Sequence, residues 1–340
     1  MREEQVVAYL QHKMPDAGEI EVSQLWRIPG GASRETWSFD ATWKEGKAPR
    51  RAPVGPRAGR GFIIRRDPEA SLLDTERYVE FRVYQALKDT GVPVPEVFWL
   101  ETDPQWLEQS FFVMGRLPGQ ASHQSIIAAD PAEREAITQQ KVEILARIHT
   151  LDWQELGLDF LGPPDGPERC ADAEIERWER TMREQMLEPQ PVLELALDWL
   201  RRNQPVAQRI TLVHGDYRTG NFLVEGNRIT GILDWEMVHL GDPLEDVAWA
   251  CLRAWRWAGD SRVGGLLPRE EFYRRYEESS GLKVDPEAVR YWEALGNVKW
   301  AIICLTGGRS FAEGRSKDAI HAFTAYMKHE IDAEILRLID

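Results

Sequence analysis

The sequence has few of the features that are typical of secreted proteins, of proteins stabilised by a structural metal ion, or of membrane-spanning proteins. Its three cysteines, Cys170, Cys251 and Cys304, lie far apart and fit neither a zinc-binding set nor a disulfide framework. No apolar run approaches the roughly 20 residues that a membrane-spanning helix needs. The opening residues Met-Arg-Glu-Glu-Gln also lack the apolar core of a signal peptide. These absences predict a cytoplasmic protein with reduced thiols and no membrane partner.

Positive charge is in short supply as well. Across 340 residues, 42 lysines and arginines face 56 aspartates and glutamates, which gives a formal net charge of −14. Because nucleic-acid binding depends on neutralising phosphates, this balance disfavours nucleic acid as a partner. The 14 tryptophans are then better explained as core or cleft-wall residues than as a platform for stacking bases. A chain of this length can bury one large or two moderate cores, and we expect a monomer or a homodimer.

The most informative stretch is residues 212–235, in which an apolar run ends in a polar loop and a short hairpin follows. The loop holds His214, Asp216 and Asn221, and the dipeptide Gly226-Asn227 suits a two-residue hairpin turn. Counting back from the turn pairs residue 225 with 228 and residue 221 with 232. Asn221 therefore opens one arm of the hairpin, and Asp234 leaves the other arm at the same end.

This layout suits phosphoryl transfer from ATP. Directly opposed strand residues lie roughly 5 Å apart, so the side chains of Asn221 and Asp234 can reach one cation. The reaction needs Mg²⁺ on the phosphates, a positioned hydroxyl and a carboxylate near the hydroxyl proton. Mg²⁺ prefers oxygen ligands and keeps several waters, so one Asn and one Asp suffice. Asp216, in the loop that feeds this end, is the candidate base; the alternative is that these polar residues only cap a hairpin.

The pattern H-G-D-x-x-x-x-N at 214–221, followed by Ile-Leu-Asp-Trp-Glu at 232–236, closely resembles the aminoglycoside phosphotransferase family. The resemblance implies that Asp216 is the catalytic base and that Asn221 and Asp234 hold Mg²⁺. It also implies that Asp246 braces the backbone of the catalytic loop, and we assign His214 to structural support. The co-substrate would be ATP, with GTP possible, and the acceptor a hydroxyl of a small molecule.

The same resemblance implies an α+β, protein-kinase-like fold with two lobes. Residues 1–115 would form a nucleotide-binding lobe with an antiparallel sheet and one main helix. Residues 116–340 would form a mainly helical lobe for catalysis and acceptor binding, with the hinge at about 115–119 and the backbone at Met114 facing the adenine edge. Periodicity predicts strands at 20–28, 36–43, 62–66, 92–100 and 111–114, and helices at 1–14, 72–89, 142–149, 172–188, 193–200, 244–252, 270–280, 286–309 and 317–339.

A glycine turn between the first two predicted strands holds Gly30, Gly31 and Ser33. In the kinase-like fold such a turn covers the phosphates of ATP with backbone N–H groups. Taken alone, the turn would be better explained as a plain hairpin connection; its place upstream of the catalytic loop favours the phosphate-covering role. Residues 44–60, which are basic and rich in proline and glycine, are interpreted as a solvated hairpin loop.

Strand alternation at 62–66 places Ile63 and Arg65 on one face, as expected for a strand that lines a nucleotide cleft. The family often has lysine here; an arginine is similar to the branch of phosphotransferase domains associated with acyl-CoA dehydrogenases. Arg65 would clamp phosphates bidentately, and Arg66 is the alternative if the register is shifted by one. Glu80 resembles the family's helix glutamate that pairs with the strand cation; the alternative is a surface partner.

Two more polar residues have structural interpretations. His149 is expected to be a hydrogen-bonded core histidine, and Asp242 is expected to cap a helix that has Pro243 in its first turn. The function predicted is a small-molecule kinase. The alternatives are a catalytically silent scaffold of the same fold, an antibiotic kinase in the strict sense, and a protein kinase. Against the last, Trp235 follows Asp234 where protein kinases carry Phe-Gly, and an Ala-Pro-Glu segment is missing.

Overall fold

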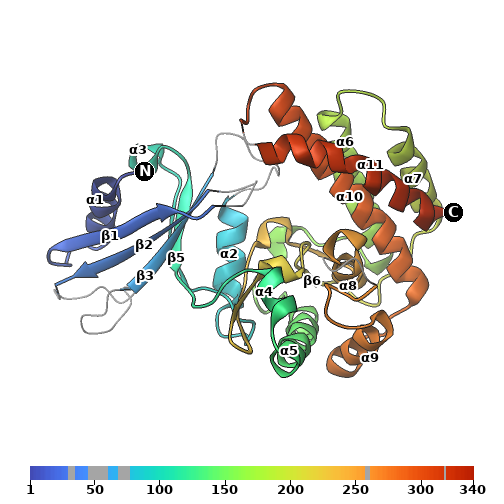
Figure 1. Ribbon diagram of the computed structural model, residues 1–340, viewed down its shortest axis with the longest axis horizontal. Coiled ribbons are helices and arrows are strands. Elements are labelled where there is room, and N and C mark those ends of the chain that lie inside the picture. Colours follow the sequence, from blue (N-terminus) through green and yellow to red (C-terminus); the bar gives the residue numbers. More distant parts are fainter. Residues whose placement is uncertain (30–34, 45–59, 68–76, 257–260, 318) are drawn as a thin grey trace. The chain divides into compact units, whose positions relative to one another are not determined.

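The computed structural model describes residues 1–29, 35–44, 60–67, 77–256, 261–317 and 319–340. The chain divides into two compact units, Met1–Gln85 with Pro95–Leu117, and Ala86–Val94 with Pro118–Asp340. The first unit contains an antiparallel sheet, and the second contains most of the helices (Figure 1).

The strands have the following bounds: β1 (Ile20–Arg27), β2 (Glu35–Trp43), β3 (Arg60–Arg66), β4 (Val97–Glu101), β5 (Phe111–Gly115), β6 (Thr211–Val213), β7 (Phe222–Glu225), β8 (Arg228–Ile232) and β9 (His239–Gly241). The helices have the following bounds: α1 (Glu3–Lys13), α2 (Arg77–Leu87), α3 (Pro104–Leu107), α4 (His123–Ala128), α5 (Pro131–Thr150), α6 (Cys170–Gln185), α7 (Pro191–Arg202), α8 (Leu244–Cys251), α9 (Arg269–Ser280), α10 (Pro286–Ala312) and α11 (Ala319–Ile339).

The sheet of the first unit has the strand order β1-β2-β3-β5-β4, with every neighbouring pair antiparallel. One face packs against α1, whose Tyr9 ring lies 4.8 Å from the ring of Phe111 on β5. Phe39 and Phe62 stack in the same core at 5.3 Å. The alternating apolar residues predicted on β2 therefore do supply one face of this core.

The opposite face of the sheet packs against α2. Phe112, between two residues that face α1, lies 5.9 Å from Phe81 and 6.0 Å from Tyr84 of α2. Because Phe112 pairs with Arg65 across β5 and β3, Arg65 belongs to this second face as well. The strand alternation thus brings Arg65 under the helix that carries Glu80.

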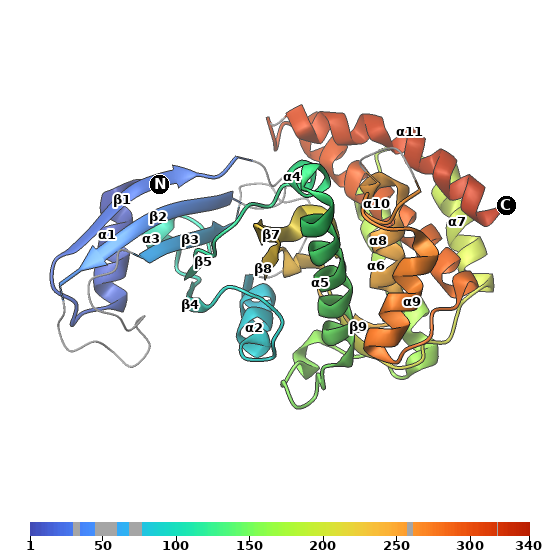
Figure 2. The same ribbon diagram turned by 60° about the horizontal axis from the view of Figure 1, so that its bottom comes forward.

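The second unit is built around α10, a 27-residue helix that is buried over most of its length. It starts at Pro286, and Asp285 caps it by accepting a hydrogen bond from the amide of Glu287 (3.0 Å). Helices α6, α7, α8 and α11 pack on it, and α5 packs on α9. Both views show α11 running alongside α10 (Figures 1 and 2).

The structure differs from the sequence-based elements in several places, among them α5, which begins at Pro131 where the prediction began at residue 142. The strand expected at 92–100 starts only at Val97, because Pro93 and Pro95 have no N–H for a ladder, and the carbonyl of Pro93 accepts from the amide of Ile232 (2.8 Å). Helices α3 and α4 were not predicted; they have four and six residues, too few for a clear period. The predicted helix at 72–89 is described from Arg77 to Leu87.

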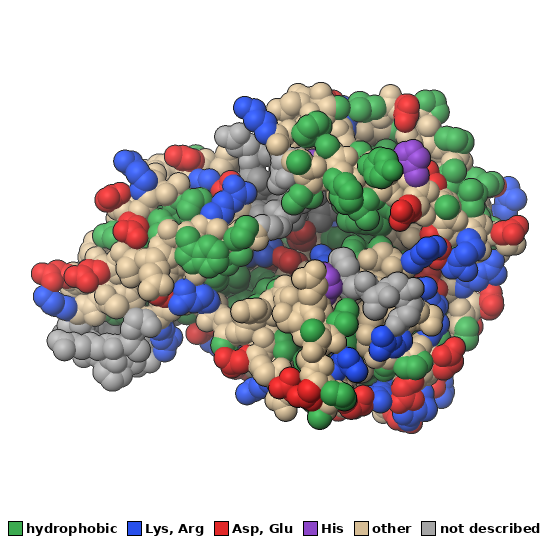
Figure 3. All heavy atoms as spheres, in the orientation of Figure 1, with side chains coloured by type: hydrophobic (Ala, Val, Ile, Leu, Met, Phe, Trp, Pro, Cys, Tyr) green, Lys and Arg blue, Asp and Glu red, His purple; other side chains and the backbone are tan. Residues whose placement is uncertain are grey.

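None of the helices in the described part of the chain has the length and apolarity needed to cross a bilayer. On the face drawn in Figure 3, acidic and basic side chains are interspersed. The acidic excess of the chain is therefore not gathered into one patch on that face.

A buried ionic cluster joins β9 to the helices of the second unit. Nε2 of His239 lies 2.9 Å from Oε2 of Glu245 and 3.6 Å from Oε1 of Glu174. The ammonium of Lys299 on α10 pairs with both carboxylates. The three His and Glu ligand atoms lie within 4.8 Å of one another, as a metal site would require. Lys299 and a protonated His239 already balance the charges of the two carboxylates, so the cluster is explained without a metal ion.

Replacing His239 with glutamine should change how stability depends on pH. Burial alone lowers the pKa of His239, but Glu174 and Glu245 raise it above its ordinary value. When the pKa of a group is higher in the folded state, its full contribution to the free energy of unfolding is present below the unfolded-state pKa, which is about 6.5 for histidine. That contribution is lost as the pH rises through the folded-state pKa. The loss of unfolding free energy in His239→Gln, measured by urea denaturation, should thus be largest below about pH 6.5 and shrink at higher pH. His329→Gln, on an exposed histidine, is the control; a pH-independent difference would contradict the expectation.

Candidate active site

The catalytic loop leaves β6, which pairs antiparallel with β9 through Thr211 and Gly241, Leu212 and Leu240, and Val213 and His239. The turn after β6 depends on Gly215, which has φ +82°. A Cβ at this position would lie 2.5 Å from the carbonyl oxygen of Met237, so both conformation and space require glycine. The Gly of the H-G-D pattern thus aims the next residue, Asp216.

The hairpin β7–β8 is present, with one difference in register. Glu225 faces Arg228 and Val224 faces Ile229, as predicted, but the register then shifts and Phe222 faces Ile232. The prediction that residue 221 faces 232 was therefore wrong by one, because it assumed an unbroken ladder. The backbone carbonyl of Asn221 instead accepts a hydrogen bond from the backbone amide of Leu233 (2.9 Å), the residue before Asp234.

The carboxylate of Asp216 is held by three donors. Oδ1 accepts from Nε1 of Trp249 (2.8 Å) and from Nε of Arg218 (3.0 Å), and Oδ2 accepts from Nδ2 of Asn221 (2.6 Å). The side chain keeps 15% of its surface exposed. A carboxylate fixed on both oxygens and still open to solvent is positioned to meet a reacting hydroxyl.

Asn221 and Asp234 are brought to the same end of the hairpin. The amide nitrogen of Asn221 is committed to Asp216, through the carboxylate and through the backbone carbonyl (2.9 Å), so its side-chain oxygen is the atom it can offer a cation. Asp234 has a left-handed backbone (φ 63°, ψ 54°) and precedes the 3₁₀ turn Trp235–Met237. A non-glycine residue in this conformation is uncommon and turns the chain sharply at the end of β8.

Asp246, on α8, is fully buried beneath the catalytic loop. Its Oδ2 accepts from the amide of His214 (2.7 Å) and its Oδ1 from the amide of Gly215 (2.9 Å). Nε2 of His149 lies 3.2 Å from Oδ2, and the hydroxyl of Tyr276 lies 2.6 Å from Nδ1 of the same histidine. Burial alone raises the pKa of Asp246, but these partners lower it below its ordinary value. The hydrogen-bonded core position expected for His149 is confirmed.

His214 connects the loop to the hairpin. Its Nε2 lies 3.0 Å from the carbonyl oxygen of Leu233, and its Nδ1 accepts from the amide of Asp216 (3.1 Å). Its ring lies 4.4 Å from that of Trp235. Burial lowers its pKa although nearby carboxylates raise it, so the imidazole is neutral at pH 7 and orients backbone rather than carrying charge. Asp242 acts as the expected helix cap by accepting from the amide of Leu244 (2.9 Å).

In the first unit, Arg65 and Glu80 form an ion pair. Nε of Arg65 lies 3.2 Å from Oε1 of Glu80, and both side chains are buried. The other carboxylate oxygen of Glu80 accepts from Arg77 (2.8 Å), which also donates to Asp67 (3.0 Å). Arg66 lies on the other face and binds Glu35 (2.6 Å), so the register that selected Arg65 is confirmed.

Met114 pairs with Ile63 of β3 and Val97 of β4, and it is buried. The turn residues Gly30, Gly31 and Ser33 lie outside the described residues. Their predicted contact with phosphates therefore stays a prediction.

Three residues of these sites were missed by the sequence analysis: Trp249, Arg218 and Arg77. Arg218 lies inside the H-G-D-x-x-x-x-N pattern, but at a position that the pattern leaves open. Trp249 lies on a helix whose eight residues are all buried, so its single polar atom gives no periodic signal.

The chain resembles known proteins in sequence. A model of the phosphotransferase enzyme family matches residues 43–292. Acyl-CoA dehydrogenase family member 10 of Mus musculus is 32% identical over 241 residues, covering 66% of this chain and 22% of that protein. Acyl-CoA dehydrogenase family member 11 of Homo sapiens is 29% identical over 245 residues, covering 70% and 31%. Hygromycin-B 4-O-kinase of Escherichia coli is 26% identical over 241 residues, covering 67% and 61%. The chain therefore spans less than a third of the two dehydrogenase relatives.

Solved structures share its fold. A protein from Ralstonia eutropha described as an aminoglycoside phosphotransferase has a TM-score of 0.74 at 23% identity, covering 99% of this chain and 98% of the other. A ternary complex of a thermostable mutant of aminoglycoside phosphotransferase APH(4)-Ia with ADP and hygromycin B has a TM-score of 0.59 at 21% identity, covering 98% of each chain. These likenesses confirm the predicted α+β, protein-kinase-like fold class.

Proposed function

Because the chain belongs to the phosphotransferase enzyme family, we propose that it moves the γ-phosphoryl group of ATP, or of GTP, to a hydroxyl of a small molecule. The observation that carries this proposal is the carboxylate of Asp216, held by Trp249, Arg218 and Asn221 on the loop that Asp246 braces. A fixed carboxylate is the one group that the reaction needs beside the nucleotide and its metal.

Asp216 is assigned the role of base toward the acceptor. Its two oxygens are fixed by donors from α8 and from the catalytic loop itself, so the carboxylate is held against rotation when the hydroxyl arrives. One oxygen has a single hydrogen bond, from Asn221, and retains lone-pair capacity for a hydroxyl proton. As the phosphoryl group moves to the acceptor oxygen, Oδ2 of Asp216 takes that proton.

The donor set fits Mg²⁺. The side chain of Asn221 can offer a metal ion only its oxygen, because its nitrogen is bonded to Asp216. Asp234 directly follows Leu233, whose backbone amide donates to the backbone carbonyl of Asn221. Two hard oxygens with room for waters match the coordination that Mg²⁺ prefers. When bound, the ion would neutralise charge on the β- and γ-phosphates. We assign Arg65, oriented by Glu80, to the nucleotide phosphates together with Gly30, Gly31 and Ser33, and the backbone at Met114 to the adenine edge.

A silent scaffold of the same fold remains the main competing function. The complete set of Asp216, Asn221 and Asp234 disfavours it, because a scaffold has no need of a base and two metal ligands on one hairpin. The relatives named after hygromycin B raise an antibiotic as one acceptor class. Fold alone does not choose the acceptor, since that choice depends on the acceptor site.

Adding Mg-ATP should raise the melting temperature of the purified protein. A ligand present at about 100 times its dissociation constant stabilises the folded state by about 2.7 kcal/mol. The measurement is a thermal shift with ATP or GTP in Mg²⁺ and in EDTA. The stabilisation should fall in EDTA and in Asp234→Asn, which removes charge from a proposed metal ligand.

Asp198→Asn is the matched control, because Asp198 is exposed on α7 and, among the described residues, pairs only with Arg202. If millimolar nucleotide gives the same shift with Mg²⁺ and with EDTA, the metal assignment is wrong. An acceptor screen that reads ADP release from a library of hydroxyl compounds then identifies the substrate class.

A further inference from the structure

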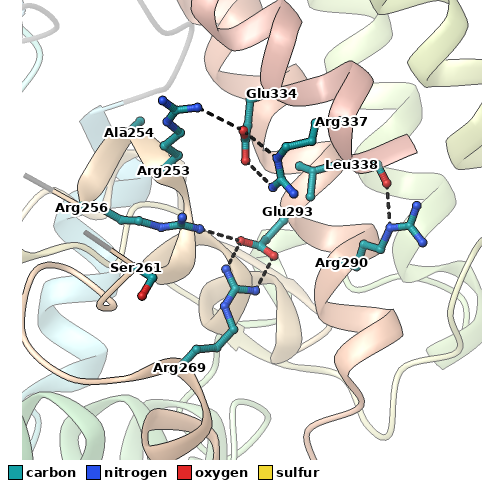
Figure 4. A pocket seen from close by; sticks show the side chains of 10 residues that line it. All are labelled: Arg253, Ala254, Arg256, Ser261, Arg269, Arg290, Glu293, Glu334, Arg337 and Leu338. Atoms are coloured by element: carbon teal, nitrogen blue, oxygen red, sulfur yellow. Dashed lines mark hydrogen bonds and ion pairs between the residues drawn. The ribbon is translucent and has the colours of Figure 1, made fainter. Parts of the chain in front are cut away.

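A pocket of about 820 Å³ in the second unit is lined by an unusual number of arginines. They come from four places in the chain, namely the 3₁₀ turn Arg253–Trp255 with the next residue, α9, α10 and α11 (Figure 4). Among the described residues, five arginines and two glutamates line it, so these lining side chains have an excess of three positive charges. In a chain of net charge −14, this is a local reversal of sign.

The two glutamates are already satisfied. Arg269 donates to both oxygens of Glu293 (2.6 and 2.7 Å), and Arg337 donates to both oxygens of Glu334 (3.0 and 2.6 Å). Both glutamates are buried, and burial alone raises the pKa of Glu334, but Arg337 and other arginines lower it. These two pairs are therefore closed ion pairs that build the wall of the pocket.

The other three arginines make longer ion pairs and no hydrogen bond to those carboxylates. Arg253 lies 3.8 Å from Glu334, Arg256 lies 3.7 Å from Glu293, and Arg290 lies 3.8 Å from Glu287, all too far for a hydrogen bond. Arg256 and Arg290 are aimed by backbone carbonyls, of Cys251 (2.9 Å) and of Leu338 (2.7 Å). In Figure 4, Arg253 and Arg256 point toward the carboxylates of Glu334 and Glu293, and Arg290 points toward the backbone of Leu338.

We propose that this pocket binds the phosphate-bearing part of a small organic molecule. Arginine forks match phosphate oxygens bidentately, and a lining with three more arginines than glutamates suits a group of two or more negative charges. The volume falls within the range of small-molecule sites, which is about 300–1,000 Å³.

The pocket also has a contact path to the catalytic loop. The ring of Trp255, between the lining residues Ala254 and Arg256, lies 4.7 Å from the guanidinium of Arg218. Arg218 in turn donates to Asp216. The phosphate could belong to the acceptor itself or to a separate ligand. The proposal that the pocket binds phosphate does not depend on the proposed phosphoryl transfer. Only the proposal that the acceptor occupies the pocket rests on the proposed function.

The test is calorimetric titration of the full chain with inorganic pyrophosphate in EDTA, which removes the metal that the proposed nucleotide site needs. We expect one pyrophosphate per chain, with affinity that falls as salt rises. Arg253→Gln with Arg290→Gln should weaken binding about a hundredfold, at about tenfold for each lost charge-assisted contact. Arg202→Gln with Arg274→Gln is the matched control, because Arg202 is 72% exposed where Arg253 is 73% exposed.

The outcomes separate this inference from the proposed function. No pyrophosphate binding by the wild type, or equal binding by the Arg253→Gln, Arg290→Gln variant, would overturn the pocket assignment. Mg-ATP thermal shifts on the same samples test the nucleotide independently. For the source of the phosphate, paired hydroxyl compounds with and without a phosphate ester are compared as acceptors. If the wild type has a lower KM for the phosphorylated member of a pair and the double variant does not, the pocket belongs to the acceptor. If pyrophosphate binds but the wild type shows no such preference, the pocket belongs to a separate ligand.

Discussion

Replacing Asp216 with asparagine should lower turnover by about 10²–10⁴-fold, the usual contribution of a general base. Asparagine keeps the size of the side chain and can still accept from Trp249 and Arg218 with its one oxygen. It has no carboxylate to take the acceptor proton, and its NH₂ group faces Asn221. The measurement is ADP release with the identified acceptor, or slow ATP hydrolysis with water as acceptor.

The control separates loss of the base from loss of the metal. Asp234→Asn weakens a proposed Mg²⁺ ligand, so raising the Mg²⁺ concentration should restore part of its turnover. The same titration should leave Asp216→Asn at its low rate, because added metal cannot replace a base. If Asp216→Asn turned over at nearly the wild-type rate, the base would be another group and the kinase-like mechanism would have to be withdrawn.

The parts of the site that the sequence predicted are those in which neighbours in the chain are also neighbours in space. Gly226-Asn227 identifies the hairpin, and the hairpin brings Asn221 to the end from which Asp234 leaves. Strand alternation likewise selected Arg65 over Arg66, because side-chain direction in a strand depends only on parity. The register error at residue 232 has a matching cause, since a shift in the ladder leaves no mark in an apolar pattern.

The parts that could not be predicted are assembled from distant elements. Trp249 reaches Asp216 across 33 positions, and Arg269 reaches Glu293 across 24. Each lies on a helix whose pattern is explained by packing or by surface charge, so the sequence offers no reason to single it out. The arginine pocket is the extreme case, because its lining residues extend from 253 to 338 and converge only through the packing of α9, α10 and α11.

Replacing Asp246 with alanine should remove about 3–5 kcal/mol of unfolding free energy, the largest stability effect expected here. The carboxylate is fully buried and satisfies the amides of His214 and Gly215 together with the ring of His149. Alanine leaves these donors without an acceptor in a site that water does not reach. A buried donor left unsatisfied costs about 1–3 kcal/mol. Urea unfolding followed by tryptophan fluorescence measures the change.

Two further variants show whether the effect comes from the brace. Asp198→Ala removes an exposed carboxylate that pairs with Arg202, and it should change stability by less than about 1 kcal/mol. Asp246→Asn keeps one oxygen for one backbone amide but turns its NH₂ group toward the other. It should therefore lose less stability than Asp246→Ala and still lower turnover, because the backbone before Asp216 is no longer fixed. Equal stability of Asp246→Ala and Asp198→Ala would show that the loop is held by β6 and β9 alone.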